Sequence, residues 1–239
     1  MSACGQEKAD AGGVVVGIDG PSGSGKSSTS RGVAQQCGLR YLDTGAMYRA
    51  ITHWMLQQEV DVSDPDAVVK HARLPTITVG TDPHAPAIAV DGRDVAAAIR
   101  NEQVTSQVSA VSAVPEVRGR LVAEQRALIA AARQEGRGVV VEGRDITTVV
   151  APDADIKLYL TASTHVRASR RSDERHTTDV ATTQEAIERR DQLDSDRATS
   201  PLTRTDEAIE LDTTGHTLAE VIDIVGGLVA EARKAVARH

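Results

Sequence analysis

A run of small residues near the N-terminus has the composition and spacing needed to hold phosphate groups. The run Gly20-Pro21-Ser22-Gly23-Ser24-Gly25-Lys26-Ser27 follows the apolar segment Val14–Ile18. Glycine lets backbone N–H groups curl around an anion, and a following helix offers its positive N-terminal end. Lys26 can reach the outer phosphates of a nucleoside triphosphate, and Ser27 can ligate Mg²⁺. We therefore expect a P-loop that binds a triphosphate, with Ser28 completing the site.

Size and composition indicate one sizeable α/β domain and exclude several classes of protein. The chain has 239 residues, of which 40% are hydrophobic and 2% aromatic, so Val, Ile, Leu and Ala must build the core. A net charge of −7 argues against a general nucleic-acid binder. No stretch approaches the roughly 18 apolar residues of a membrane helix. Cys4 and Cys37 have no metal or disulfide spacing and fit a cytoplasmic protein.

Apolar runs alternate with helical patterns and predict a parallel β-sheet with helices on both faces. Strands are expected at Val14–Ile18, from Tyr41, at Val139–Glu142, at Ile156–Leu160 and at Ala208–Leu211. Helices are expected from the P-loop to Cys37, over Ala46–Gln57, Pro115–Glu135 and Thr183–Ala198, and after Thr217. Ligands of such sheets bind beyond the carboxyl ends of the strands, where the P-loop and residues 43–45 and 142–145 lie.

The segment 61–114 differs from the rest because it is rich in proline and in short strand patterns. Thr76–Val79 and Ala87–Val90 predict two short strands, and Asp91-Gly92 predicts a hairpin turn into Arg93–Val95. We therefore expect a small antiparallel sheet inserted among the parallel strands. The first residues, 1–12, are small and polar and are expected to form a flexible tail.

Arginine outnumbers lysine by 22 to 5, and its planar fork matches phosphate and carboxylate groups. Arg49 lies one turn into the helix after Asp43-Thr44-Gly45, where it could contact an anion or remain exposed. Glu142-Gly143-Arg144-Asp145 follows a buried strand directly. There Arg144 could bind a phosphate and Asp145 a substrate donor, or the two could form a surface ion pair of little energetic weight.

A third group of charges follows further along the chain. Arg190, Asp194 and Arg197 have the spacing i, i+4 and i+7, which predicts one helical face. This face could be solvated, or it could close over substrate phosphates together with arginines of the preceding segment, namely Arg167, Arg170 and Arg171. A mobile lid that carries arginines suits phosphoryl transfer, which needs charge neutralisation and exclusion of water.

The P-loop alone leaves the reaction open, but one common class is excluded. A GTPase needs an Asn-Lys-x-Asp motif to recognise its base, and the single asparagine, Asn101, precedes Glu102. The seven histidines show no metal-ligand spacing.

Taken together, these motifs resemble those of bacterial cytidylate kinases over nearly the whole chain. The matching strings are Asp19 to Ser27, Leu42-Asp43-Thr44-Gly45-Ala46-Met47-Tyr48-Arg49, Gly143-Arg144-Asp145 and the segment Arg190 to Leu202. The resemblance implies a three-layer P-loop kinase fold with a five-stranded parallel core over residues 13–60 and 115–239. It also implies a nucleoside-monophosphate-binding insertion at 61–114 and a helical lid at 165–185. The implied reaction transfers the γ-phosphoryl group of ATP to CMP or dCMP with Mg²⁺.

The resemblance also implies roles for single residues. Ser109, Arg118 and Asp145 would read cytosine, and a carboxylate at Asp145 suits the exocyclic amine. Arg190 and Asp194 would contact the ribose. Phosphate ligands would be Ser22, Arg49, Arg144 and Arg197, with Thr44, Tyr48 and Gly143 beside them in the pocket. Lys26, Arg144 and Arg197 would stabilise the transition state, and Ser27 would ligate Mg²⁺.

Two alternatives remain open from the sequence. One is a P-loop kinase that acts on UMP or another small molecule. The other is a nucleotide-binding regulator without catalysis, against which the arginine clusters argue because a sensor needs no second phosphate site. The sequence does not distinguish CMP from dCMP as acceptor, and the family resemblance implies a monomer.

Overall fold

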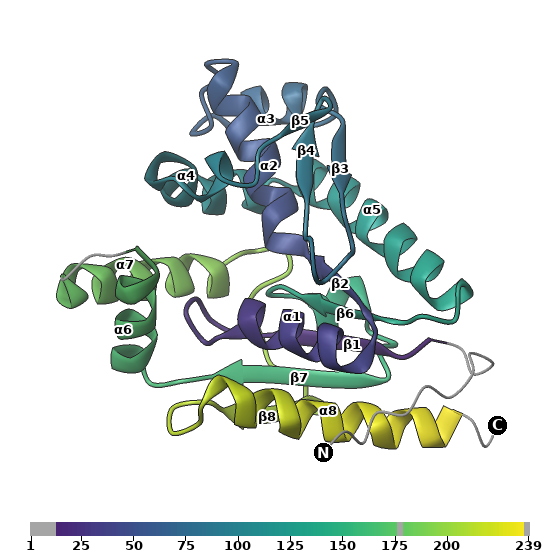
Figure 1. Ribbon diagram of the computed structural model, residues 1–239. Helices are drawn as coiled ribbons and strands as arrows, with labels where there is room; N and C mark the ends of the chain where they lie inside the picture. Colours follow the sequence, from purple (N-terminus) through teal and green to yellow (C-terminus); the bar gives the residue numbers. More distant parts are fainter. Residues whose placement is uncertain (1–12, 176–178, 237–239) are drawn as a thin grey trace.

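The computed structural model describes residues 13–175 and 179–236, so the expected tail at 1–12 lies outside the described residues. Its core is a parallel sheet of five strands in the order β2-β6-β1-β7-β8 (Figure 1). The strands are β1 (Val15–Asp19), β2 (Arg40–Asp43), β6 (Val139–Glu142), β7 (Ile156–Thr161) and β8 (Ile209–Asp212). Every pairing between them is parallel, which confirms the expected α/β fold with a five-stranded core.

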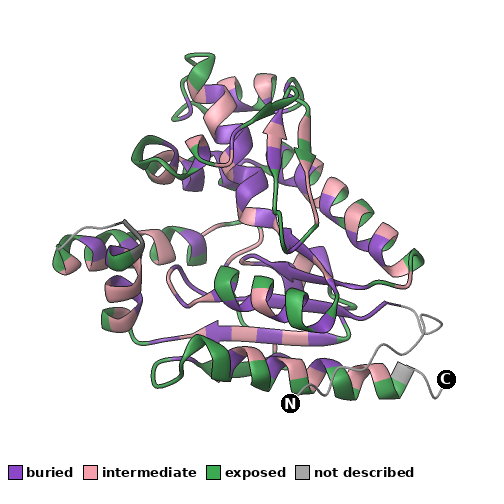
Figure 2. Ribbon diagram, viewed as in Figure 1, coloured by how far each residue is buried: buried purple, intermediate pink, exposed green. Residues whose placement is uncertain are grey.

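Side chains alternate along the buried strands and feed two separate hydrophobic clusters, so the core has three layers. Val14, Val16 and Ile18 face α1 (Lys26–Cys37) and α8 (Leu218–Val236). Val15 and Val141 face the other cluster, against α2 (Thr44–Gln57) and α5 (Pro115–Gln134). Strands β1 and β6 are buried throughout (Figure 2), whereas β8, at the edge of the sheet, is mostly exposed. None of the helices in the described part of the chain combines the length and apolar composition that a membrane crossing requires.

The expected antiparallel insertion is present above the core (Figure 1). It contains β3 (Ile77–Val79), β4 (Ile88–Val90) and β5 (Arg93–Asp94), and the turn at Asp91-Gly92 has positive φ at both residues. The sequence did not indicate its helices α3 (Pro65–His71), η1 (Ala98–Arg100) and α4 (Glu102–Ala113). Helix α4 was not predicted because its sequence is rich in β-branched residues and serine. Its N-terminus is nevertheless capped by the Asn101 side chain, which accepts from Val104 N at 2.7 Å.

Two helices stand at the end of the sheet that carries the P-loop (Figure 1). They are α6 (Thr164–Arg175), which the sequence indicated only as an arginine-rich segment, and α7 (Val180–Ser195). The expectation of one helical face is wrong for Arg197, because α7 ends with Asp196 as its C-cap and Arg197 lies beyond it. How the chain divides into core, insertion and lid stays a prediction.

Candidate active site

The P-loop connects β1 to α1 through backbone conformations that favour glycine. Gly23 and Gly25 have φ values of 78° and 87°. A Cβ at Gly23 would come within 2.8 Å of the Arg167 carbonyl oxygen. Helix α1 has no side-chain cap and no acidic residue in its first turn, so its leading N–H groups face no competing carboxylate there. The start of this helix is therefore built to receive an anion.

Lys26 lies buried at the mouth of this loop. Its Nζ donates to the Pro21 carbonyl oxygen at 2.6 Å and contacts Ser24 Oγ at 3.3 Å. Burial, and then the charge of Arg144, hold the pKa of Lys26 well below its usual value. A phosphate bound here would supply the missing negative charge, so nucleotide binding favours the charged ammonium.

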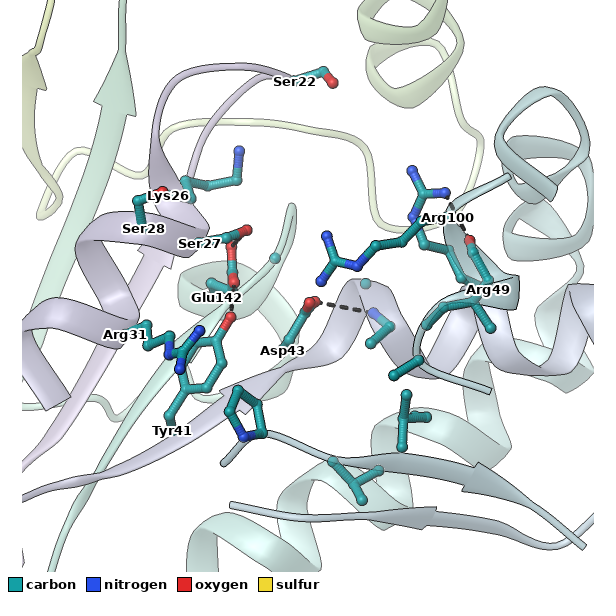
Figure 3. A pocket seen from close by; sticks show the side chains of 18 of the residues that line it. Ser22, Lys26, Ser27, Ser28, Arg31, Tyr41, Asp43, Arg49, Arg100 and Glu142 are labelled. Carbon is teal, nitrogen blue, oxygen red and sulfur yellow. Dashed lines mark hydrogen bonds between the residues drawn. The ribbon is translucent and has the colours of Figure 1, made fainter. Parts of the chain in front are cut away.

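Glu142, at the end of β6, joins the P-loop to β2. Ser27 Oγ donates to Glu142 Oε2 at 2.9 Å, and the Tyr41 hydroxyl donates to Glu142 Oε1 (Figure 3). Burial, and then the charge of Asp43, raise the pKa of Glu142 to about 7. The sequence reasoning gave Glu142 no role. The feature that could have indicated one is an acidic residue at the end of a buried strand; in the structure this strand lies beside β1, with Glu142 paired to Ile18.

The donors around Ser27 fit Mg²⁺. A hydroxyl and a carboxylate offer oxygen ligands, which Mg²⁺ prefers, and this ion is normally held by one or two carboxylates plus substrate phosphates. Within the described residues no group of three or more His, Cys, Asp or Glu side chains could hold a metal ion by itself. The Ser27–Glu142 pair therefore suits an ion that arrives with the nucleotide.

A cavity of about 760 Å³ opens in front of the P-loop (Figure 3). Predicted site residues on its wall are Ser22, Gly23, Gly25, Lys26, Ser27, Ser28, Arg49, Gly143, Arg144 and Arg190. Arg100 of the insertion, which the sequence reasoning missed, and Arg171 of α6 also line it. Gly20, Pro21 and Ser24 do not line it; the Ser24 hydroxyl instead donates to the Pro21 carbonyl oxygen within the loop.

A smaller pocket adjoins this cavity and contains the remaining predicted substrate residues. It is lined by Thr44, Tyr48, Ser109, Arg118, Gly143, Arg144, Asp145, Arg190, Asp194 and Arg197, among others. Gly45, Gly143, Arg144 and Arg190 line both spaces. The structure thus places two polar pockets side by side, with two arginines between them.

Asp194 organises the arginines at this boundary. Its carboxylate accepts from Arg144 Nε at 3.0 Å and also from Arg197 Nη2. Burial opposes ionisation of Asp194, but Arg144 and Arg197 outweigh it and keep its pKa below the usual range. Arg190 lies 4.0 Å from the same carboxylate; burial and Arg144 lower the pKa of Arg190 to about 9.

Part of the wall of the smaller pocket is suited to polar recognition. Arg118, on α5, pairs with Asp145 and donates to the Ser112 carbonyl oxygen at 3.1 Å. Its guanidinium lies 5.4 Å from the centre of the Tyr48 ring. Both members of the Arg118–Asp145 pair are buried, so their directions are fixed by the surrounding protein.

Arg49 reaches from the core into the insertion. It donates to the Ile99 carbonyl oxygen at 3.2 Å and to Thr105 Oγ1 at 2.9 Å. Burial, and then Arg171, lower the pKa of Arg49 to about 10. Arg49 therefore lines the cavity while it also anchors η1 and α4.

Helices α6 and α7 contact the P-loop directly through Arg167 and Asp191, of which the sequence reasoning named only Arg167. Asp191 Oδ1 accepts from Ser22 N at 2.9 Å, and Arg167 donates to the Ser22 carbonyl oxygen at 2.9 Å. Asp191 was missed, although it follows Arg190 directly. Arg170 also lies beside the P-loop: it donates to Thr213 Oγ1 at 2.9 Å, and Thr213 Oγ1 donates to the Ser24 carbonyl oxygen at 3.2 Å.

A parallel sheet with a P-loop cavity and an adjoining, arginine-lined pocket defines a P-loop kinase. Comparison with known proteins identifies which kind. A family sequence model described as "Cytidylate kinase" matches residues 16–231. The chain therefore belongs to the cytidylate kinase family.

Individual relatives agree with this assignment. The cytidylate kinase of Streptomyces avermitilis is 57% identical over 222 residues, covering 93% of this chain and 95% of that protein. That of Corynebacterium diphtheriae is 45% identical over 231 residues, covering 95% and 99%. A crystal structure of an uncharacterized protein from Eubacterium ventriosum shares the fold, with a TM-score of 0.50 and 10% identity, covering 91% of this chain and 98% of that chain.

Proposed function

We propose that the chain transfers the γ-phosphoryl group of ATP to CMP or dCMP and releases ADP with CDP or dCDP. The observation that carries this proposal is the pair of adjoining pockets, which share Arg144 and Arg190 between them. Such an arrangement suits a donor triphosphate and an acceptor monophosphate whose phosphates meet at the boundary. Family membership supports the choice of acceptor.

Phosphoryl transfer to CMP requires little covalent chemistry from the protein. The acceptor oxygen is already anionic, so positioning and electrostatic stabilisation of the moving phosphoryl group suffice. Lys26 would contact the transferred group, while Arg144 and Arg197 would neutralise charge on the acceptor side. Ser22 and Arg49 would hold the acceptor phosphate. Mg²⁺, bound with ATP beside Ser27 and Glu142, would neutralise charge on the β- and γ-phosphates.

Selection of the base would fall to Asp145, Arg118 and Ser109. The exocyclic amine of cytosine is a hydrogen-bond donor, whereas uracil presents a carbonyl oxygen at the same position. A buried carboxylate at Asp145 accepts from the first and opposes the second. Asp194 and Arg190 would contact the ribose, and Thr44, Tyr48 and Gly143 would complete the wall.

The test is a substrate profile with ATP and Mg²⁺. CMP and dCMP should be phosphorylated with kcat/KM values far above those for AMP, GMP and UMP. Equal rates on UMP would overturn the base assignment, and saturable CMP binding without turnover would favour a regulator. We further propose that the protein is cytoplasmic and monomeric. Light scattering during size-exclusion chromatography tests whether it is a monomer.

A further inference from the structure

We propose that Tyr41 is a positioning residue of this site: its hydroxyl holds the Glu142 carboxylate beside Ser27 and thereby tightens the binding of metal-bound ATP. The inference rests on the proposed function for the identity of the nucleotide. Tyr41 lies on β2, lines the larger cavity, and comes directly before the Leu42–Arg49 string.

The strand register makes this contact possible. β2 and β6 are parallel neighbours, with Tyr41 beside Val140 and Asp43 beside Glu142. Tyr41 therefore lies one step behind the carboxyl edge of the sheet, and its ring reaches forward to the carboxylate (Figure 3). The Tyr41 residue is 5% exposed and Glu142 is 3% exposed, so water does not readily replace either partner.

Both oxygens of the carboxylate have a donor. Ser27 Oγ donates to Oε2 at 2.9 Å, and the Tyr41 hydroxyl donates to Oε1. A metal ion held by Ser27 would take a lone pair of its hydroxyl oxygen, and the O–H can still donate to Oε2. The Tyr41 bond fixes the other oxygen, Oε1, so the carboxylate keeps its orientation beside Ser27 and does not rotate toward Lys26, whose charge lies nearby. Partners that orient ligand groups in this way commonly change metal affinity by about 10- to 100-fold.

The protein fixes Tyr41 itself from the opposite side. Tyr41 N donates to the Thr81 carbonyl oxygen of the β3–β4 loop at 2.9 Å. The same loop is held against α1, where Arg31 Nε donates to the Pro83 carbonyl oxygen at 2.7 Å and Gln35 Nε2 donates to it at 2.9 Å. The Tyr41 backbone is thus bonded to a loop that is itself anchored to α1, and these contacts fix the position of the Tyr41 hydroxyl.

The experiment compares wild type with Tyr41→Phe, which removes the hydroxyl and keeps the ring. Binding of Mn²⁺ in the presence of the non-hydrolysable analogue AMP-PNP is measured by electron paramagnetic resonance, and turnover is measured against Mg²⁺ concentration. Tyr159→Phe is the matched control, since Tyr159 lies on β7 and does not line the cavity. Glu142→Gln and the double variant complete a cycle.

We expect Tyr41→Phe to weaken Mn²⁺ binding and raise the Mg²⁺ concentration for half-maximal turnover, each by roughly 10-fold. KM for CMP should stay within a factor of two, and Tyr159→Phe should match wild type. In the Glu142→Gln background the same substitution should have an effect of less than about 2-fold.

Unchanged Mn²⁺ binding in Tyr41→Phe would overturn the inference, as would an undiminished effect in the Glu142→Gln background. A loss in Tyr41→Phe that is matched by Tyr159→Phe would also overturn it, because general loosening of the sheet would then be the cause. The Mn²⁺ measurement needs no acceptor. Failure of wild type to phosphorylate CMP would therefore remove the proposed function while leaving the role of Tyr41 to be decided by binding.

Discussion

Arg144 and Asp194 meet across the site, with Arg144 Nε donating to Asp194 Oδ2 at 3.0 Å although they lie 50 positions apart in the chain. One follows β6 in the core, and the other belongs to α7. The bond therefore connects the loop after β6, which lines both pockets, to helix α7 beside the P-loop. Because Asp194 also accepts from Arg197, one buried carboxylate sets the direction of two guanidinium groups.

Asp194→Ala should disrupt this arrangement. Removing a buried carboxylate leaves Arg144 and Arg197 without their partner, and truncation of such a pair costs about 2–5 kcal/mol. We expect kcat/KM for CMP to fall by roughly 100-fold or more, mostly through KM. Steady-state kinetics with varied CMP measure this. Asp196→Ala, at an exposed position two residues along, is the control, and equal effects of the two changes would contradict the role given to Asp194.

Asp145→Asn tests the reading of the base. The amide can donate as well as accept, so the penalty against the carbonyl oxygen of uracil should fall. The preference for CMP over UMP in kcat/KM should drop by about 10- to 100-fold, since one good base contact carries roughly 1–3 kcal/mol. Parallel assays with CMP and UMP give the ratio. Asp153→Asn, on the exposed loop after η2 (Ile146–Val150), should leave it unchanged; an unaltered ratio in Asp145→Asn would remove Asp145 from base recognition.

Local patterns predicted the core well, because its strands and caps are decided by nearby residues. Val14–Ile18 is short and β-branched, and the structure has a strand at Val15–Asp19. Gly38 ends α1 in the left-handed conformation, as expected for a helix stop. The capping box at Thr217 and Glu220 also forms, with Glu220 N donating to Thr217 Oγ1 at 3.3 Å.

What could not be predicted depends on contacts between distant segments. Glu142 and Tyr41 gain their environment only from the pairing of β2 with β6, which no local pattern contains. Asp191 meets Ser22 across 169 positions, and nothing near either residue marks the other. Helix α4 is similar: its sequence is a weak helix former, and burial of Val104, Val108 and Val111 supplies the stabilisation.

Asp19→Ala should destabilise the fold. The buried carboxylate accepts from Ile146 N and Thr147 N, each at 2.8 Å, and from Thr147 Oγ1 at 2.7 Å. Leaving these donors without a partner should lower the free energy of unfolding by roughly 2–4 kcal/mol. Denaturant titration followed by circular dichroism measures the change. Asp206→Ala, at an exposed site, provides the comparison; similar stabilities for all three proteins would show that these bonds contribute nothing net.

Lys26→Ala should act on the chemical step more than on acceptor binding. The ammonium lies at the P-loop, where charge develops on the transferred group, and loss of one such donor typically lowers kcat by about 100- to 1,000-fold. KM for CMP should change by less than about 3-fold, because the acceptor pocket does not include Lys26. Initial rates over a CMP range at saturating ATP separate the two constants. Lys70→Ala, on α3, serves as control; turnover retained in Lys26→Ala would exclude a transition-state role.

Glu142 should make the stability of the nucleotide-free and metal-free protein depend on pH. Burial, and then Asp43, raise its folded pKa to about 7 from an ordinary value of 4.5. A raised pKa means that the folded state binds the proton more tightly, so this stabilisation is complete below pH 4.5 and is lost as the pH rises through 7.

The variant Glu142→Gln keeps the shape of the side chain but has no group that titrates. The melting temperature of wild type minus that of Glu142→Gln should therefore decrease from pH 5 to about pH 7 and level off above it, as scanning calorimetry would measure. The corresponding difference for Glu188→Gln, an exposed glutamate on α7, should stay flat. A flat difference for Glu142→Gln as well would mean that the carboxylate is charged throughout this range and that its bonds from Ser27 and Tyr41 outweigh its burial.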